Sequence, residues 1–279
     1  MSRNESGSPI LPGATIGILG GGQLGRMTAL AAANLGYRCH IFCQNPDEPA
    51  AQVATVTTLG RFDDADALDS FAARIDVATL EFENVPIETL ERIAARVPVH
   101  PAPSVQAVAQ NRLREKTFAN ELGIATAPFR AVGDAAALVG AIAEIGTPAV
   151  LKTVRFGYDG KGQVGIDAAT DPTEAWAASG AGPDTDGGIL EGFVDFACEI
   201  SVIVARAPNG ETAAFVPVEN RHRNHILDET IVPAPIPDAT SQMARDVAIR
   251  LCEGLGVVGL LAVEMFVTAQ GDVLVNEVA

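Results

Sequence analysis

The sequence predicts a mixed α/β and α+β protein, in which a Rossmann-like domain with a parallel sheet precedes a region made of two lobes. Three observations indicate this order. Strand-like and alanine-rich helical runs alternate over residues 14–96. Three prolines between residues 97 and 103 interrupt the alternation. A short glycine-rich segment and then a series of apolar strand-like runs follow them, which is typical of an α+β arrangement.

The N-terminal elements alternate between strand and helix. We expect buried strands over residues 15–19, 38–43 and 77–82, and helices over 23–35 and 87–96, with Gly36 ending the first helix. A strand–helix–strand order of this kind predicts a parallel sheet covered by helices on both faces. We therefore expect a flexible tail over 1–13 and a Rossmann-like domain over 14–105.

The second region, residues 106–279, is expected to hold the two lobes. Ser104 resembles a helix N-cap before a helix over 105–122. A small lobe over about 124–188 has a helix over 135–145, a strand over 149–154 and a glycine-rich loop. The remaining lobe, 189–279, reads as antiparallel strands over 197–205, 213–219, 260–268 and 272–278, with one helix over 241–255.

Composition narrows the classes of function. The chain has 279 residues and a formal net charge of −16, which argues against a nucleic-acid-binding surface. It shows neither an apolar run long enough to span a bilayer nor a signal peptide, so we expect no membrane partner and a cytoplasmic location. The four cysteines form no CxxC pair, which favours reduced thiols over a disulfide or a zinc site.

A glycine turn, Gly20-Gly21-Gly22-Gln23-Leu24-Gly25, lies between the first strand and the first helix. Free N–H groups at such a helix start attract an anion. A dinucleotide site would also need an acidic residue at the end of the second strand, but that strand ends in Phe42-Cys43-Gln44. We therefore expect an anion site rather than an NAD site. A glycine turn needed only for close helix packing is the alternative.

A strand ending in a lysine leads into a second glycine-rich loop, Lys152-Thr153-Val154-Arg155-Phe156-Gly157-Tyr158-Asp159-Gly160-Lys161-Gly162-Gln163. Lysine supplies point charge, and glycine lets backbone N–H groups approach phosphate oxygens. The loop is not a Walker loop. We favour a phosphate-binding lid over a solvated hairpin, because an unpaired ammonium in the apolar strand of Lys152 would be costly.

Two carboxylates face each other in a predicted hairpin near the C-terminus. With its turn centred between Gln270 and Gly271, Glu264 falls opposite Glu277. Oxygen ligands without cysteine or histidine suit Mg²⁺. Two acids facing solvent at a sheet edge are the alternative.

Two further runs carry weaker signals. The segment Glu191-Gly192-Phe193-Val194 could offer backbone groups to an adenine edge, and Glu199 could accept ribose hydroxyls. A linker with solvated acids explains them equally well. The basic run around His222 and His225 fits anion or nucleotide contact better than a metal site, and a charged turn after a strand is its alternative.

Together these runs resemble the ATP-grasp superfamily, and within it the 5-(carboxyamino)imidazole ribonucleotide synthases. The runs that carry the resemblance are Ile18-Leu19-Gly20-Gly21-Gly22-Gln23-Leu24-Gly25-Arg26-Met27, Phe156-Gly157-Tyr158-Asp159-Gly160-Lys161-Gly162-Gln163 and Val275-Asn276-Glu277. Glu81-Phe82-Glu83-Asn84-Val85 and Glu219-Asn220-x-His222 support them. The resemblance covers the chain from about Thr15 to its last residue and implies an ATP-grasp fold in the second region.

The resemblance implies an ATP- and Mg²⁺-dependent ligase of purine biosynthesis, working as a homodimer. ATP would phosphorylate bicarbonate to carboxyphosphate, and 5-aminoimidazole ribonucleotide would then be carboxylated. The implied ATP contacts are Arg112, Lys152, Gly157, Tyr158, Asp159, Gly160, Lys161, Gly162, Gln163, Glu191, Gly192, Phe193, Val194, Glu199, His222, Asn276 and Glu277. Tyr158, Asp159 and Lys161 would be catalytic, Glu264 and Glu277 would hold the metal, and Gly22, Gln23, Leu24 and Glu81 would bind the ribonucleotide.

The chain departs from the family pattern after Glu277. In the family that strand runs into Ala-Pro-Arg-x-His-Asn-Ser-Gly-His and a further small domain, whereas this sequence stops at Ala279. We therefore expect a chain that binds nucleotide but turns over little by itself. The alternatives are another ATP-grasp carboxylase or ligase, a nucleotide-binding module without chemistry, and an NAD-dependent oxidoreductase.

Overall fold

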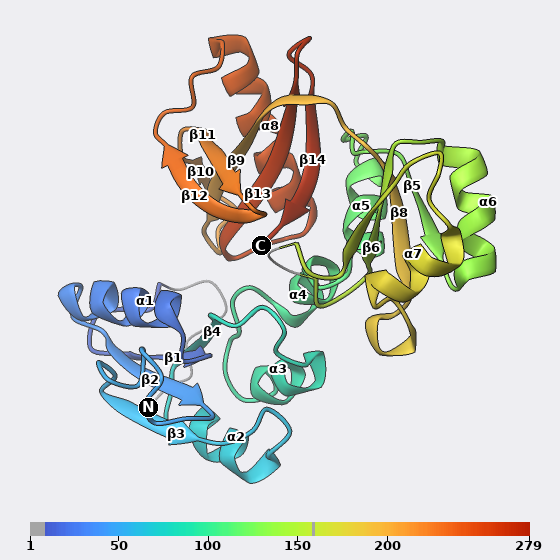
Figure 1. Cartoon of the computed structure of the whole chain (residues 1–279). Helices are drawn as coiled ribbons and strands as arrows, with labels where there is room; N and C mark the ends of the chain where they lie inside the picture. The colour runs from blue at the N-terminus through green and yellow to red at the C-terminus, as the bar shows by residue number, and fades with distance from the viewer. Residues whose placement is uncertain (1–8, 158–159) are drawn as a thin grey trace. The chain divides into compact units, whose positions relative to one another are not determined.

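A computed structural model describes residues 9–157 and 160–279. The chain forms two compact units (Figure 1). The first reaches to Ala107 and includes Arg206–Glu211 and Gly256–Gly259. The second comprises Val108–Ala205, Thr212–Leu255 and Leu260–Ala279.

The first unit contains the predicted parallel sheet. Its strands are β1 (Thr15–Leu19), β2 (Arg38–Cys43), β3 (Val56–Leu59) and β4 (Val77–Leu80), in the order β3-β2-β1-β4. Helix α1 (Gln23–Asn34) packs on one face. Helices α2 (Ala65–Ala72) and α3 (Ile87–Ala94) pack on the other, around the fully buried Phe42 and Phe71. The expectation of helices on both faces is therefore confirmed.

Sequence reasoning missed two elements of this unit and extended two others. Strand β3 is short and only half-buried, so its residues Val-Thr-Thr-Leu give no clear apolar pattern. Helix α2 was also missed, although Asp64 caps it by accepting from the N–H of Ala67 at 3.0 Å. β4 ends at Leu80 rather than at residue 82, and α3 ends at Ala94 rather than at 96.

The single helix predicted over residues 105–122 is wrong, because the chain forms two helices there. They are α4 (Pro103–Ala109) and α5 (Arg112–Glu121). Asn111 breaks the run: its backbone is extended, and its side chain accepts from the N–H of Arg114 at 3.0 Å. Ser104 lies within α4, so it is not the N-cap of that helix. This break makes Arg112 the first residue of α5.

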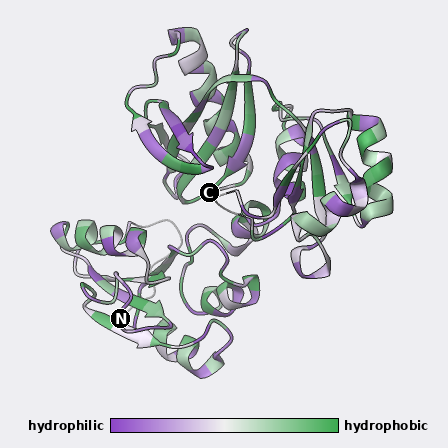
Figure 2. Ribbon diagram, in the orientation of Figure 1, coloured by the Kyte–Doolittle hydropathy of each residue, from purple (hydrophilic) through white to green (hydrophobic). Residues whose placement is uncertain are grey.

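The second unit holds two antiparallel sheets. The smaller consists of β5 (Phe129–Val132), β6 (Ala149–Thr153), β7 (Gln163–Ile166) and β8 (Gly188–Gly192), in the order β5-β8-β6-β7. Helices α6 (Ala135–Ile145) and α7 (Pro172–Ser179) cover one of its faces, and a short 3-10 turn lies at Pro183–Thr185. Figure 2 shows α6 largely in green, in keeping with its alanine, leucine and isoleucine residues.

The larger sheet carries the C-terminal hairpin. Its strands are β9 (Phe196–Arg206), β10 (Thr212–Ala214), β11 (Val218–Arg223), β12 (Ile226–Ile231), β13 (Gly259–Thr268) and β14 (Val273–Val278), with α8 (Asp238–Gly254) packed against them. The main order is β12-β11-β9-β13-β14, and β10 pairs with β9. The single strand predicted over 213–219 is two strands, because Pro217 lies between them and has no N–H to donate. β12, which is almost wholly exposed, was missed.

The sequence predicts neither a membrane-spanning helix nor a disulfide. Over 9–157 and 160–279, none of the helices is both long enough and apolar enough to cross a bilayer. The four cysteines lie within this range, and no disulfide joins them.

Candidate functional site

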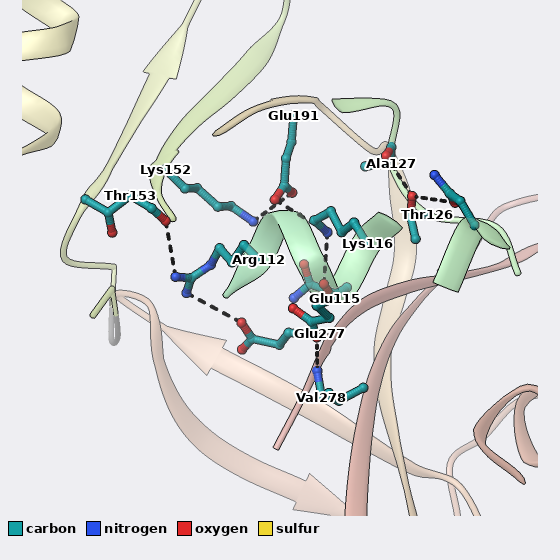
Figure 3. Close-up of polar contacts among 12 residues, drawn as sticks. Arg112, Glu115, Lys116, Thr126, Ala127, Lys152, Thr153, Glu191, Glu277 and Val278 are labelled. Atoms are coloured by element: carbon teal, nitrogen blue, oxygen red, sulfur yellow. Dashed lines mark hydrogen bonds and ion pairs between the residues drawn. The ribbon is translucent and has the colours of Figure 1, made fainter. Parts of the chain in front are cut away.

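Helix α5 directs three charged side chains towards the strands of both sheets of the second unit. Arg112, Glu115 and Lys116 are spaced i, i+3 and i+4, so they share one face of the helix. Figure 3 shows Lys116 directed at Glu191 of β8, and Arg112 and Glu115 directed at the end of β14.

Glu191 lies between two lysines. Its Oε2 accepts from Lys152 Nζ at 3.0 Å, and its Oε1 lies 3.4 Å from Lys116 Nζ. Burial by itself raises the pKa of Glu191, but the charges of Lys152 and Lys116 outweigh it and hold that pKa below its usual value. Lys152 therefore does have the partner that its position in an apolar strand requires. The partner is the Glu191 carboxylate, a residue that the sequence assigned to the adenine edge.

The same helix face fixes the end of β14. Lys116 Nζ donates to the backbone oxygen of Asn276 at 2.9 Å, and the N–H of Val278 donates to Glu115. Arg112 Nη2 lies 3.6 Å from Glu277 Oε2. Burial raises the pKa of the Glu115 carboxyl well above its usual value, although the charge of Lys116 opposes that rise.

The glycine-rich loop begins beside Arg112. The guanidinium donates to the backbone oxygens of Thr153 at 3.3 Å and of Gly157 at 2.9 Å. Tyr158 and Asp159, which the sequence assigned to catalysis, lie outside the described residues. Lys161 is exposed, and Gln163 pairs with Lys152 across β6 and β7.

Gly160 and Gly162 are required as glycines. Their φ angles are +75° and +71°, in the left-handed region that favours glycine. A Cβ on Gly160 would also lie 2.7 Å from His225 Cβ, and one on Gly162 would lie 2.8 Å from Thr153 Oγ1. The loop therefore passes too close to its neighbours for any side chain at these two positions.

The carboxylate pair of the hairpin is confirmed in register. Glu264 in β13 pairs with Glu277 in β14, as predicted. Nearer the turn the register of the two strands is different, because Val267 lies opposite Val273 and the turn is therefore centred on Gln270. A register shift between Glu264 and Met265 restores the predicted pairing. Burial first, and the charge of Glu277 second, raise the pKa of Glu264 to about 7. The two groups thus repel each other and would accept a cation between them.

Glu199 and His222 lie near this pair, whereas the adenine candidates follow β8 of the small sheet. Glu199 Oε2 is 2.5 Å from His222 Nδ1, and both residues act electrostatically on Glu264. Gly192 ends β8, and the N–H of Phe193 donates to Pro148 at 3.1 Å. Phe193 is exposed and Val194 half-buried, so the chain leaves the small sheet directly after β8, which lies between β5 and β6.

The glycine turn of the first unit is occupied by a carboxylate. The N–H of Gly22 donates to Glu81 Oε2 at 3.0 Å, and a Cβ on Gly22 would lie 2.2 Å from Glu81 Oε1. The N–H of Gly22 therefore already has an anionic partner, and the anion site expected at this turn stays a prediction. Leu24 and Gln23 begin α1 beside it, and the side chain of Leu24 is exposed.

Sequence reasoning missed Glu115 and Lys116. Both are buried, with Lys116 only 1% exposed. The sequence does hold one indication of Lys116. The chain has only three lysines (Lys116, Lys152 and Lys161), and Lys116 follows Arg112 by one helical turn. Helical spacing from Arg112 could have indicated a shared face, but not burial.

Comparison with known proteins agrees with the order of the two units. The model of the ribonucleotide synthetase preATP-grasp domain matches residues 13–110, and that of the ATP-grasp domain matches residues 117–279. The N5-carboxyaminoimidazole ribonucleotide synthase of Brucella melitensis is 46% identical over 271 residues, which are 96% of this chain and 74% of that protein.

Solved structures of N5-carboxyaminoimidazole ribonucleotide synthetases are also similar to this chain. A crystal structure of an ADP complex of an N5-carboxyaminoimidazole ribonucleotide synthetase is 43% identical with a TM-score of 0.92, covering 97% of this chain and 71% of that one. The Aspergillus clavatus N5-carboxyaminoimidazole synthase in complex with ADP and 5-aminoimidazole ribonucleotide is 27% identical with a TM-score of 0.87, covering 95% and 69%.

Proposed function

Since the chain belongs to the N5-carboxyaminoimidazole ribonucleotide synthases, the ATP-grasp ligases that make this compound in purine biosynthesis, we propose that it uses ATP to carboxylate 5-aminoimidazole ribonucleotide. Bicarbonate attacks the γ-phosphorus of ATP, which gives carboxyphosphate and releases ADP. The exocyclic amine then takes the carboxyl group, and phosphate leaves. A homodimer and a cytoplasmic location are part of the proposal.

The observation that carries the ATP site is the gathering of cations at one place in the second unit. Lys116 and Lys152 pair with the single carboxylate of Glu191, and the guanidinium of Arg112, on the same helix face as Lys116, braces the start of the glycine-rich loop. Fixed positive charge of this kind stabilises a phosphoryl group in transfer. Lys161 and the backbone of Gly160 and Gly162 complete the proposed phosphate site.

Magnesium fits the carboxylate pair. Among the residues that the structure describes, no group of three or more histidines, cysteines or acids could hold a metal ion. Glu264 and Glu277 alone would therefore hold Mg²⁺ together with phosphate oxygens, as this ion is commonly bound. When bound, the ion would neutralise charge on the transferring phosphoryl group.

The ribonucleotide is assigned to Gly22, Gln23, Leu24 and Glu81 of the first unit. Because Glu81 is a carboxylate at the turn, it would repel a phosphate and would accept from a hydroxyl or amine. We therefore propose that a donor group of the ribonucleotide, rather than its phosphate, contacts Glu81.

An assay of ADP release tests the function. ATP, Mg²⁺ and bicarbonate are supplied with either 5-aminoimidazole ribonucleotide or glycinamide ribonucleotide, and ATP binding is followed in parallel by calorimetry. ADP release that depends on 5-aminoimidazole ribonucleotide supports the proposal. A preference for glycinamide ribonucleotide would contradict it, and an absence of ATP binding would contradict the nucleotide site itself.

A further inference from the structure

Lys116 is the most deeply buried cation of the nucleotide site, with 1% of its side chain exposed. Burying an ammonium ion costs several kcal/mol unless charged and polar partners compensate. Its partners come from two different sheets: Glu191 in β8 at 3.4 Å, and the backbone oxygen of Asn276 in β14 at 2.9 Å (Figure 3). Lys116 thus joins the small sheet to the end of the C-terminal hairpin.

The charges around Glu191 do not cancel. Two ammonium groups, Lys116 and Lys152, share one carboxylate, so these three groups together carry one positive charge. The carboxyl of Glu115, beside Lys116, has a pKa that burial raises well above its usual value, which favours its neutral form. The charges of both lysines hold the pKa of Glu191 low against its burial, which keeps the carboxylate ionised. Lys152 is the more exposed of the two lysines, at 18%, so the surplus charge is available to a ligand through Lys152.

We propose that Lys116 is a positioning residue that neutralises Glu191 and thereby leaves the charge of Lys152 to the phosphates of ATP. This inference rests on the proposed function and adds to it a residue that does not itself touch the nucleotide. If Lys116 is removed, the remaining pair of Lys152 and Glu191 is neutral, and its attraction for a phosphate falls. The contact with Asn276 gives Lys116 a second effect, because it holds the backbone beside Glu277 in place.

Calorimetric titration with ADP and with adenosine tests the inference, because the two ligands differ only in the diphosphate. Lys116→Met removes the charge and keeps an unbranched side chain. We expect it to weaken ADP binding by about tenfold or more, and adenosine binding by less than about threefold. Lys116→Arg, which keeps the charge, should recover part of the ADP affinity.

A double variant separates charge balance from packing. Lys116→Met with Glu191→Gln removes one positive and one negative charge, which restores the single surplus charge on Lys152. ADP affinity relative to adenosine should then return towards that of the unchanged chain. In this variant Lys152, which is 18% exposed, keeps its charge without a carboxylate partner. If Lys116→Met alone does not fold, Lys116→Gln takes its place, because the amide has no charge and can still donate a hydrogen bond. Arg130→Met is the matched control. It removes an exposed cation of β5 in the same small sheet, and this cation pairs with Glu144 of α6.

Three outcomes would overturn the inference. The first is that Lys116→Met binds ADP as the unchanged chain does. The second is that it loses ADP and adenosine affinity equally, as replacement of a purely structural lysine would cause. The third is that the double variant folds and still shows a reduced ratio of ADP to adenosine affinity. If the unchanged chain itself binds no ADP, the proposed function fails first, and that result is distinct from the other three.

Discussion

At the scale of single residues, the buried His40 links the stability of the folded protein to pH. His40 in β2 is 1% exposed, and its Nε2 lies 2.8 Å from Thr58 Oγ1. Burial, and then the charge of Arg74, lower its pKa from 6.5 to about 4. The imidazole is therefore neutral in the folded chain at a pH where the unfolded chain would bind a proton.

His40 should make the folded protein sensitive to acid. Its contribution to stability is complete above pH 6.5 and is lost as the pH falls towards 4, by roughly 3 kcal/mol in total. His40→Gln should flatten the free energy of unfolding over this interval, measured by urea denaturation at several pH values. His225→Gln is the control. An unchanged slope in His40→Gln would contradict the assignment.

Glu277 offers a second residue-scale prediction. Glu277→Gln keeps the size of the side chain and removes a charge that faces Glu264 in the hairpin. The affinity for ATP in the presence of Mg²⁺ should fall by about tenfold or more, because one of two carboxylate ligands is lost. Calorimetry with and without Mg²⁺ measures this. The exposed Glu253→Gln serves as control, and an unaltered magnesium dependence in Glu277→Gln would refute the metal site.

At the scale of elements, the junction of β1 and α1 depends on the close approach of β4. The Glu81 carboxylate accepts from the N–H of Gly22 at the start of α1, where no side chain caps the helix. The φ angle of Gly22 is −73°, which any residue can adopt. Glycine is needed there for space and not for backbone freedom.

Gly22→Ala should therefore destabilise the first unit. The added Cβ would meet Glu81 Oε1 at 2.2 Å, so the carboxylate must move away and its hydrogen bond with the Gly22 N–H is lost, which typically costs about 0.5–1.5 kcal/mol. Thermal denaturation should show a lowered midpoint. Gly165→Ala in β7, where a Cβ meets nothing within 4 Å, is the matched control.

A second substitution checks the cause of this loss. Glu81→Ala removes the obstructing carboxylate, so adding it to Gly22→Ala should cost less than the two single changes predict together. Strict additivity would mean that the contact with Glu81 is not what excludes alanine.

At the scale of the whole molecule, the sequence predicted architecture better than it predicted contacts. The parallel sheet and the pairing of Glu264 with Glu277 could be predicted, since apolar periodicity and turn position determine them. The break at Asn111 could not, because one side-chain cap overrides a continuous helical pattern. Nor could the partner of Lys152 be named, because Glu191 lies 39 residues away and meets it only across β6 and β8. The domain boundaries remain predictions.

The division into two units predicts where nucleotide will protect the backbone. ADP at about 100 times its dissociation constant should stabilise the folded second unit by about 2.7 kcal/mol. Hydrogen exchange with mass spectrometry should then show slower exchange in α5, β6, β8 and β14, and little change in β1 to β3. Equal protection of the N-terminal sheet would contradict a nucleotide site built from the second unit.

The distribution of lysines has a practical consequence for covalent chemistry. Lys116 is sealed from solvent, whereas Lys152 is partly accessible and Lys161 is exposed. The two lysine amines that a reagent can reach both belong to the proposed phosphate site. An amine-reactive probe should therefore modify the lysines of this chain only at that site, and ATP should shield them, so that the native protein can report nucleotide occupancy without an engineered label.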